Sequence, residues 1–213
     1  MTAPALRTAT ETSRLLALSD GVISIAITLL TFDLVVPALP PGAPPGALFA
    51  SLAAQWQSLL GYALSFLTIA LYWILHRRLF VYVDAHDRGV LWLNVLFLLL
   101  VAVVPFATSV FSRYPTRVGV TFYATVLALT GFSLTLLWLY VSRNRLLAAG
   151  LSSRLVGIEA ARFLAAPVVF VFSILVATVD PTLAILSWLL LVPINGLLQS
   201  RLVAAGEPPL GDA

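Results

Sequence analysis

Long apolar stretches separated by short polar connections set the pattern of this 213-residue chain. A helix that crosses a hydrocarbon core of about 30 Å needs about 20 apolar residues, because each residue advances it by about 1.5 Å. Six stretches come close to that length or exceed it, at residues 15–36, 50–75, 89–112, 118–142, 158–179 and 182–200. The pattern therefore predicts an all-α integral membrane protein with six transmembrane helices.

Prolines separate or bend these predicted helices. The segment 37–48 holds five prolines and two glycines, which predicts a stiff, extended linker that cannot continue a helix. Pro105, Pro167 and Pro193 lie inside apolar stretches, where neighbouring helices can satisfy the freed carbonyl groups. We expect kinks there rather than breaks, and we treat residues 1–213 as one six-helix domain.

The distribution of arginines predicts the orientation, because positive charge near helix ends stays in the cytoplasm. Ten arginines precede, follow or connect the stretches on one side, and only Arg113 and Arg117 fall on the other. The ten are Arg7, Arg14, Arg77, Arg78, Arg88, Arg143, Arg145, Arg154, Arg162 and Arg201. Both termini are then cytoplasmic, the linker 37–48 is extracellular, and residues 204–213 form a short cytoplasmic tail.

Composition excludes the other broad classes. Hydrophobic residues make up 61% of the chain and charged residues 10%, whereas soluble domains carry about 25% charged residues. The net charge of +3 is too sparse to form a basic face for nucleic acid. The chain has no cysteine, so disulfides and thiolate metal sites are excluded. A cleaved signal peptide is disfavoured for the first stretch, which is too long and contains Asp20 and Asp33.

The first predicted helix is unusually polar for a membrane span. Arg14, Ser19, Asp20, Ser24, Thr28, Thr31 and Asp33 lie in it or beside it. Charged groups inside a bilayer usually face protein or water, so we expect this helix to be the most enclosed by protein. At 100° per residue, one face carries an apolar stripe that Thr28 flanks, and Asp20 points about 140° away from it. The stripe consists of Gly21, Ile25, Leu29, Phe32 and Val36.

These residues leave alternatives open. The stripe is either the apolar constriction of a pore or an ordinary helix-packing face. Asp20 is either a permeation or proton-relay group or a buried partner of an arginine or histidine. Asp33 either attracts cations at a pore mouth or marks the water interface.

A second polar cluster connects the second and third predicted helices. His76 and Asn94 lie deep enough to form hydrogen bonds between helices. Asp84, His86 and Asp87 lack a recognised metal-ligand spacing, so we predict no metal site there.

Catalytic motifs are absent as well. The stretch from Gly131 to Ser133 has no histidine partner nearby, which favours helix packing, and no T-V-G-Y-G potassium filter is present.

Four blocks in about the first half of the chain resemble the bacterial branch of the transmembrane protein 175 potassium channels. Arg14-x-x-x-Leu18-Ser19-Asp20 is similar to the R-x-x-x-F-S-D signature of their first helix, with leucine in place of phenylalanine. The similarity continues in Trp73-x-x-His76-x-x-Leu79-Phe80, in Asp87 through Asn94, and in Val104-Pro105-Phe106. The second half agrees only in the number of helices. The leucine at position 18 puts local packing in doubt rather than the ion chemistry.

The resemblance implies a homotetramer in which copies of the first helix line a central, potassium-selective pore without a carbonyl filter. Ile25 would form the narrowest ring, Thr28 a hydroxyl layer, and Leu29 and Phe32 further lining. From its position near the extracellular end, and not from the resemblance, we predict that Asp33 lies at the pore mouth. A structural polar network would comprise Arg14, Ser19, Asp20, His76, Asp87 and Asn94.

We therefore predict a potassium channel of the bacterial inner membrane, with K⁺ as permeant ion, lipid and further copies of itself as partners, and neither cofactor nor enzymatic activity. The first rival is a proton-coupled secondary transporter that uses Asp20 and His76. The second is a non-conducting scaffold whose first helix is wholly packed.

Overall fold

The computed structural model of the chain describes residues 3–203, and side chains from residue 12 onward. The predicted tail 204–213 lies outside the described residues. Every regular element is helical: α1 (Ala3–Leu29), η1 (Leu30–Asp33), α2 (Ala47–Ala53), α3 (Trp56–Tyr82), α4 (Arg88–Arg113), α5 (Arg117–Arg143), α6 (Ser153–Val176), α7 (Pro181–Ser187), η2 (Trp188–Leu190) and α8 (Leu191–Val203).

Six segments are long and apolar enough to cross a membrane, which confirms the predicted number of candidate spans. They are Thr12–Asp33, Trp56–Tyr82, Arg88–Arg113, Arg117–Arg143, Ser153–Val176 and Pro181–Val203. Two predicted boundaries were wrong. The second span begins at Trp56 because a turn separates it from α2, and the fifth begins at Ser153. Arg78 consequently lies inside α3 rather than in a connection, since arginine is a good helix former even where hydropathy falls. Arg162 lies inside α6, within the predicted stretch 158–179.

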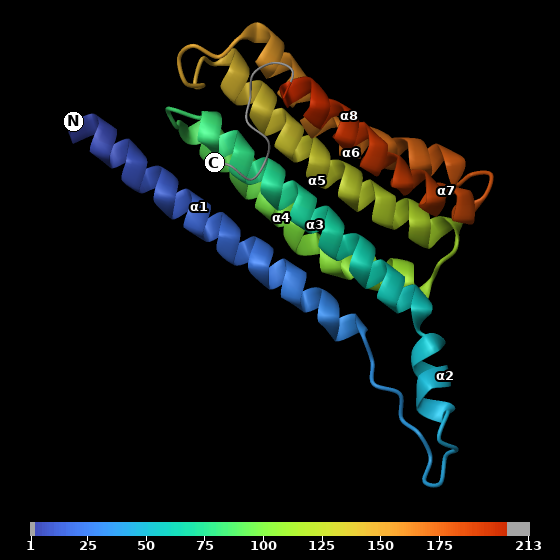
Figure 1. Cartoon of the computed structure of the whole chain (residues 1–213). Helices are drawn as coiled ribbons and strands as arrows, with labels where there is room; N and C mark the ends of the chain where they lie inside the picture. Colours follow the sequence, from blue (N-terminus) through green and yellow to red (C-terminus); the bar gives the residue numbers. More distant parts are fainter. Residues whose placement is uncertain (1–2, 204–213) are drawn as a thin grey trace.

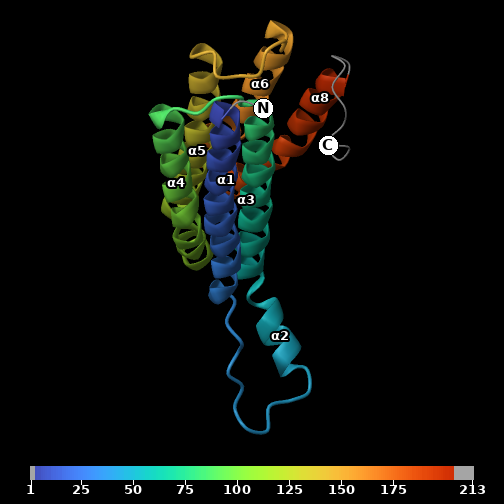
Figure 2. The same cartoon turned by 90° about the vertical axis from the view of Figure 1, so that its left-hand side faces the viewer.

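The helices form a bundle with α5 at its centre (Figure 1). Helix α5 packs between α4 and α6, whereas α1 lies at one side against α4 and α3. Figure 2 shows α1 in front of these two helices and α8 diverging from the bundle. The expectation that the first helix is the most enclosed is wrong for the single chain, because 67% of the α5 span is buried and only 28% of the α1 span. One buried face is enough to accommodate the interior polar side chains of α1.

Gly131 in α5 permits a close approach of α3 and α6 to α5. A Cβ atom there would lie 2.8 Å from both the Tyr72 hydroxyl and Pro167 Cδ, so a larger residue would push α3 and α6 away. Thr135 Oγ1 donates a hydrogen bond shared between the carbonyls of Gly131 and Phe163, at 2.8 Å each. The segment from Gly131 to Ser133 thus takes part in packing, as its sequence indicated.

The prolines have different effects. Helices α4 and α6 continue through Pro105 and Pro167. The last span contains the 3₁₀ turn η2 just before Pro193 in α8, where proline cannot donate a hydrogen bond to the carbonyl four residues earlier. The segment 34–46 has no helix, and α2 follows it.

The connection between α5 and α6 packs against the end of α3. Val83 and Leu147 form an isolated antiparallel bridge. The amide of Asp84 donates to the Leu146 carbonyl at 3.0 Å, and that of Ala148 donates to the Tyr82 carbonyl at 2.8 Å. These bonds hold the end of α3 beside the start of α6.

Candidate functional site

Helix α1 has one buried face and one exposed face. Ile23 and Leu30 are 2% and 1% exposed against the bundle, whereas Ile25 and Phe32 on the other face are 60% and 80% exposed. Gly21, Thr28 and Leu29 are also exposed. The stripe predicted from periodicity therefore has no covering partner within the described part of the chain. Such a face requires either lipid or another subunit beside it.

Thr28 is positioned to act as an acceptor on this face. Its hydroxyl donates to the Ile25 carbonyl at 2.9 Å, and the Thr31 hydroxyl donates to the Thr28 carbonyl at 2.8 Å. A hydroxyl has one hydrogen and two acceptor lone pairs. With the hydrogen engaged in the helix, the lone pairs of Thr28 stay available on the exposed side.

Asp33 ends η1 next to the exposed stripe. It is only half-buried, but its Oδ2 atom is shielded from solvent and has no hydrogen-bond partner among the described residues. Its carboxylate is thus less open to solution than Phe32 beside it.

Three predicted network residues form one continuous chain of hydrogen bonds between helices. Asn94 Nδ2 of α4 donates to Ser19 Oγ of α1 at 3.0 Å, and Asn94 Oδ1 lies 2.7 Å from His76 Nε2 of α3. The Ser19 hydroxyl donates to the Leu15 carbonyl at 2.9 Å. Because Asn94 Oδ1 can only accept, His76 carries its proton on Nε2. The three side chains are at most 1% exposed, so the chain joins α1, α3 and α4 in the interior.

Asp20 lies at the edge of the buried face of α1 and bonds to α3. The indole Nε1 of Trp73 donates to Asp20 Oδ1 at 2.8 Å. The guanidinium of Arg77 lies over the Trp73 ring, 5.3 Å from its centroid. These residues border a half-open cavity of about 250 Å³. The partner of Asp20 in the single chain is thus an indole, not the arginine or histidine that we expected.

The structure does not bring Arg14 and Asp87 into this network. Arg14 is exposed on α1, and no ion pair joins it to an acidic residue within residues 12–203. Asp87 is the N-cap of α4: its Oδ1 accepts from the Val90 amide at 2.9 Å and its Oδ2 from the Tyr140 hydroxyl at 2.7 Å. Hydrogen bonds to the ionised form lower the pKa of Asp87. His86 is 2.7 Å from Thr12 Oγ1 instead of a metal-ligand group.

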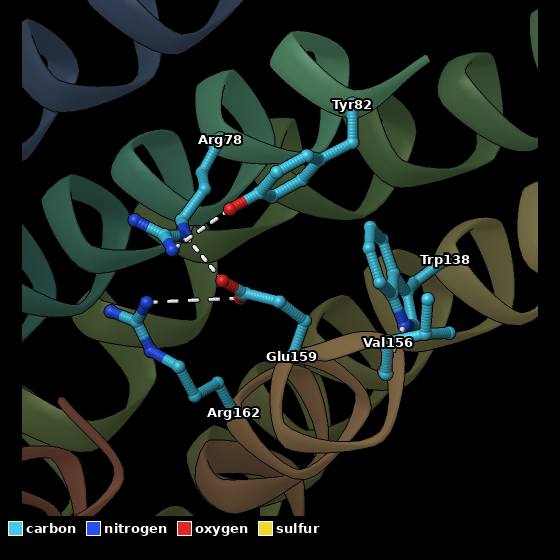
Figure 3. A network of polar contacts seen from close by, with 6 residues as sticks. All are labelled: Arg78, Tyr82, Trp138, Val156, Glu159 and Arg162. Atoms are coloured by element: carbon cyan, nitrogen blue, oxygen red, sulfur yellow. Dashed lines mark hydrogen bonds and ion pairs between the residues drawn. The ribbon is translucent and has the colours of Figure 1, made fainter. Parts of the chain in front are cut away.

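Sequence reasoning missed a buried charge cluster between α3 and α6, shown in Figure 3. Arg78 Nε donates to Glu159 Oε1 at 2.5 Å, and Arg78 Nη2 donates to the Tyr82 hydroxyl at 2.9 Å. Arg162 Nη1 lies 3.7 Å from Glu159 Oε2. The signal was an acidic and a basic residue three positions apart inside an apolar stretch, a pattern that marks a protein-facing side of a membrane helix. We had counted Arg162 among the arginines outside the stretches, although it falls within the predicted stretch 158–179, and therefore overlooked it.

The fold and these contacts define a multi-pass helical membrane protein whose first span is fixed by buried polar bonds on one side and exposed on the other. The family model described as endosomal/lysosomal potassium channel TMEM175 matches residues 14–105. A potassium channel of Streptomyces collinus is 37% identical over 139 residues, or 63% of this chain and 66% of that protein, just under two thirds of its length. A potassium channel of Chamaesiphon minutus is 36% identical over 143 residues, or 65% of this chain and 70% of that protein.

Similarity extends to a vertebrate protein and to a solved structure. The endosomal/lysosomal proton channel TMEM175 of Homo sapiens is 37% identical over 110 residues, or 48% of this chain and 22% of that protein. The crystal structure of a lysosomal potassium-selective channel TMEM175 homolog from Chamaesiphon minutus matches with a TM-score of 0.74 and 26% identity, over 89% of this chain and 98% of that one. The chain therefore belongs to the TMEM175 family. Its relatives are named as channels, which agrees with the expectation that it is not an enzyme.

Proposed function

We propose that this chain is one subunit of a potassium-selective channel and that α1 from four identical subunits lines the central pore. The names of the bacterial relatives support conduction of potassium. The observation that carries the proposal is the exposed face of α1. Ile25 and Thr28 lie there, opposite the residues that pack into the subunit.

The pore is narrowest at Ile25 in this proposal, with Leu29 and Phe32 as further apolar lining. An apolar ring gates or selects because an ion must lose water to pass it. Potassium surrenders its water at lower cost than the smaller sodium ion, so it passes more easily. The lone pairs of Thr28, left free by the bond to the Ile25 carbonyl, replace part of the lost hydration one turn beyond the ring.

The buried bonds of α1 have a structural role in this mechanism. Ser19 and Asp20 tie α1 to α4 and α3, which fixes the rotation of the helix and thus the side chains that face the pore. Asp33 lies at the extracellular mouth. Both termini face the cytoplasm of a bacterial cell, and the protein lies in its inner membrane without a cofactor.

A reversal-potential measurement tests the function. Purified protein in lipid, with potassium on one side and sodium on the other, should give a current that reverses only when the potassium side is strongly negative. A secondary transporter would saturate and require a coupled substrate, and a scaffold would carry no current. Either outcome would reject the channel.

Proton conduction is a second candidate, because the human relative is named a proton channel. Recordings with equal potassium on both sides and a pH gradient separate the two ions. A current that reverses at zero under this gradient supports potassium as the permeant ion. A reversal that follows the pH gradient supports the proton.

A further inference from the structure

The cluster of Arg78, Glu159 and Arg162 lies inside the subunit and away from α1 (Figure 3). The side chains of Glu159 and Arg162 are 0% and 4% exposed, and that of Arg78 is 10% exposed. Arg78 is four residues from the end of α3, or about 6 Å along the helix axis. The cluster is therefore buried close to one end of the bundle.

The contacts within the cluster are unequal. Glu159 Oε1 accepts from Arg78 at 2.5 Å, whereas the nearest approach of Arg162 to the other carboxylate oxygen is 3.7 Å, beyond hydrogen-bond distance. Arg162 Nε and Nη1 are buried, and neither atom has a hydrogen-bond acceptor in the described part of the chain. Arg162 thus shares its only ion-paired carboxylate with a second arginine that makes the shorter contact.

A buried guanidinium with two N–H groups that lack acceptors raises the free energy of the folded state. A hydrogen bond to a charged group that is left unmade inside a protein costs the desolvation of that group, and an arginine keeps its charge under all ordinary conditions. An acceptor that also carries negative charge would satisfy the free Nε–H group and balance the charge that the incomplete ion pair leaves. The low exposure of Arg162 restricts that acceptor to a small ion.

We propose that Arg162 is the anchor of a binding site for a small inorganic anion of about the size of chloride, between α6 and the end of α3. The anion accepts a hydrogen bond from Arg162 Nε, while Nη1 stays 3.7 Å from Glu159 Oε2. Its bound state stabilises the folded subunit, because an ion that binds only the native state raises stability with its concentration. The site does not depend on potassium conduction, since its ligand groups are outside α1.

Thermal unfolding of the purified full chain in detergent tests the site. Chloride is exchanged for gluconate at constant potassium and constant ionic strength. The unfolding midpoint should rise with chloride concentration. Above the dissociation constant of the site, we expect a rise on the order of 3 °C for each tenfold increase in chloride. Equal midpoints in chloride and gluconate would overturn the proposal.

Two single-charge variants should change this chloride dependence in opposite directions. Arg162→Gln removes the anchor and should abolish it. Glu159→Gln removes the competing negative charge and should shift the chloride response to lower concentration. Arg154→Gln, an exposed arginine of the same helix, is the matched control and should respond as the parent does. A cluster with a purely structural role would lower the midpoint in both buried variants and leave the chloride response unchanged.

A carboxylate from the same chain or a lipid phosphate could occupy the place of the anion beside Arg162. Two further experiments distinguish these sources. Glu207→Gln combined with Asp212→Asn should leave the chloride response unchanged. Vesicles of phosphatidylglycerol added in gluconate should not reproduce it. If the tail variant alone lowers stability as Arg162→Gln does, or if the lipid stabilises where chloride does not, the small-anion site is refuted. If Arg162→Gln fails to fold, the chloride dependence of the parent and of Glu159→Gln still tests the site.

Discussion

Single residues on α1 differ in role according to the face they occupy. Ile25 and Ile23 are two positions apart and chemically identical, yet one is 60% exposed and the other 2%. Truncation of Ile23 opens a cavity in the subunit, which costs stability. Truncation of Ile25 opens no such cavity and changes only the contacts on the exposed face of α1.

Ile25→Ala should increase the current and weaken discrimination between potassium and sodium. The change removes four branched side chains from one level of the proposed pore, so the constriction becomes wider and wetter. Thr28→Val, which keeps the size but removes the hydroxyl, should give a smaller loss of selectivity. Reversal potentials under mixed potassium and sodium gradients measure both effects.

Leu175→Ala is the matched control, since Leu175 is 65% exposed on α6 at the far side of the bundle from α1 (Figure 1). It should conduct and select like the parent. If Ile25→Ala behaves in the same way as this control, the exposed face of α1 meets lipid, and the apolar constriction is not at Ile25.

At the level of elements, the position of α1 depends on a few polar bonds to α3 and α4. Ser19, Asn94 and His76 form one buried chain, and Trp73 adds a bond from α3 to Asp20. Interhelical hydrogen bonds are weak individually in membranes, but removing a shared partner leaves two buried groups unsatisfied. Asn94 is that shared partner.

Asn94→Leu should destabilise the folded subunit by about 1–3 kcal/mol, because Ser19 and His76 both lose their bond to it. Unfolding of purified protein in detergent measures the loss. Asn195→Leu makes the same substitution at a residue whose amide bonds only to its own helix, at the Leu191 carbonyl, and should cost less. Equal stability of Asn94→Leu and the parent would show that this network does not hold α1.

The start of α4 should respond to pH through Asp87. Its pKa is lowered in the folded state, so its contribution is fully present above the ordinary aspartate pKa and is lost as the pH falls through the folded value. Asp87→Ala should therefore cost about 1 kcal/mol at neutral pH, as for the loss of an N-cap, and almost nothing in strong acid. Unfolding midpoints from neutral pH down into strong acid measure this. Asp84→Ala, at an exposed residue of the same connection, should cost little at either pH; a pH-independent cost for Asp87→Ala would contradict the cap.

For the whole molecule, the two ends of the bundle carry unequal positive charge. Ten of the twelve arginines belong to one end by the order of the helices. The positive-inside rule predicts that this end faces the cytoplasm and that the proline-rich linker lies outside.

Cysteine labelling tests this orientation without background, because the chain has no cysteine of its own. Ala38→Cys in the linker should react with a membrane-impermeant maleimide on intact cells. Ala149→Cys, an exposed residue in the connection between α5 and α6, should react only after lysis. The reverse pattern would invert the topology.

Hydropathy and periodicity alone predicted the six spans and the two faces of α1. Both are local properties: apolar length decides whether a segment spans a membrane, and residues three or four apart share one side of a helix. The family resemblance also followed from short local motifs such as Leu18-Ser19-Asp20. Helix ends were less predictable, since Arg78 interrupts hydropathy without ending α3.

Only the tertiary structure decided which polar side chains meet. Asn94 bonds to Ser19 and His76, whereas Asp87 caps its own helix and reaches Tyr140. Glu159 accepts a hydrogen bond from Arg78 of α3, which lies 81 residues earlier in the sequence. Such pairs depend on the rotation and relative height of packed helices, which contacts such as the close approach at Gly131 determine. The apolar residues of a span do not indicate which neighbour they face, because lipid and protein interior are equally apolar.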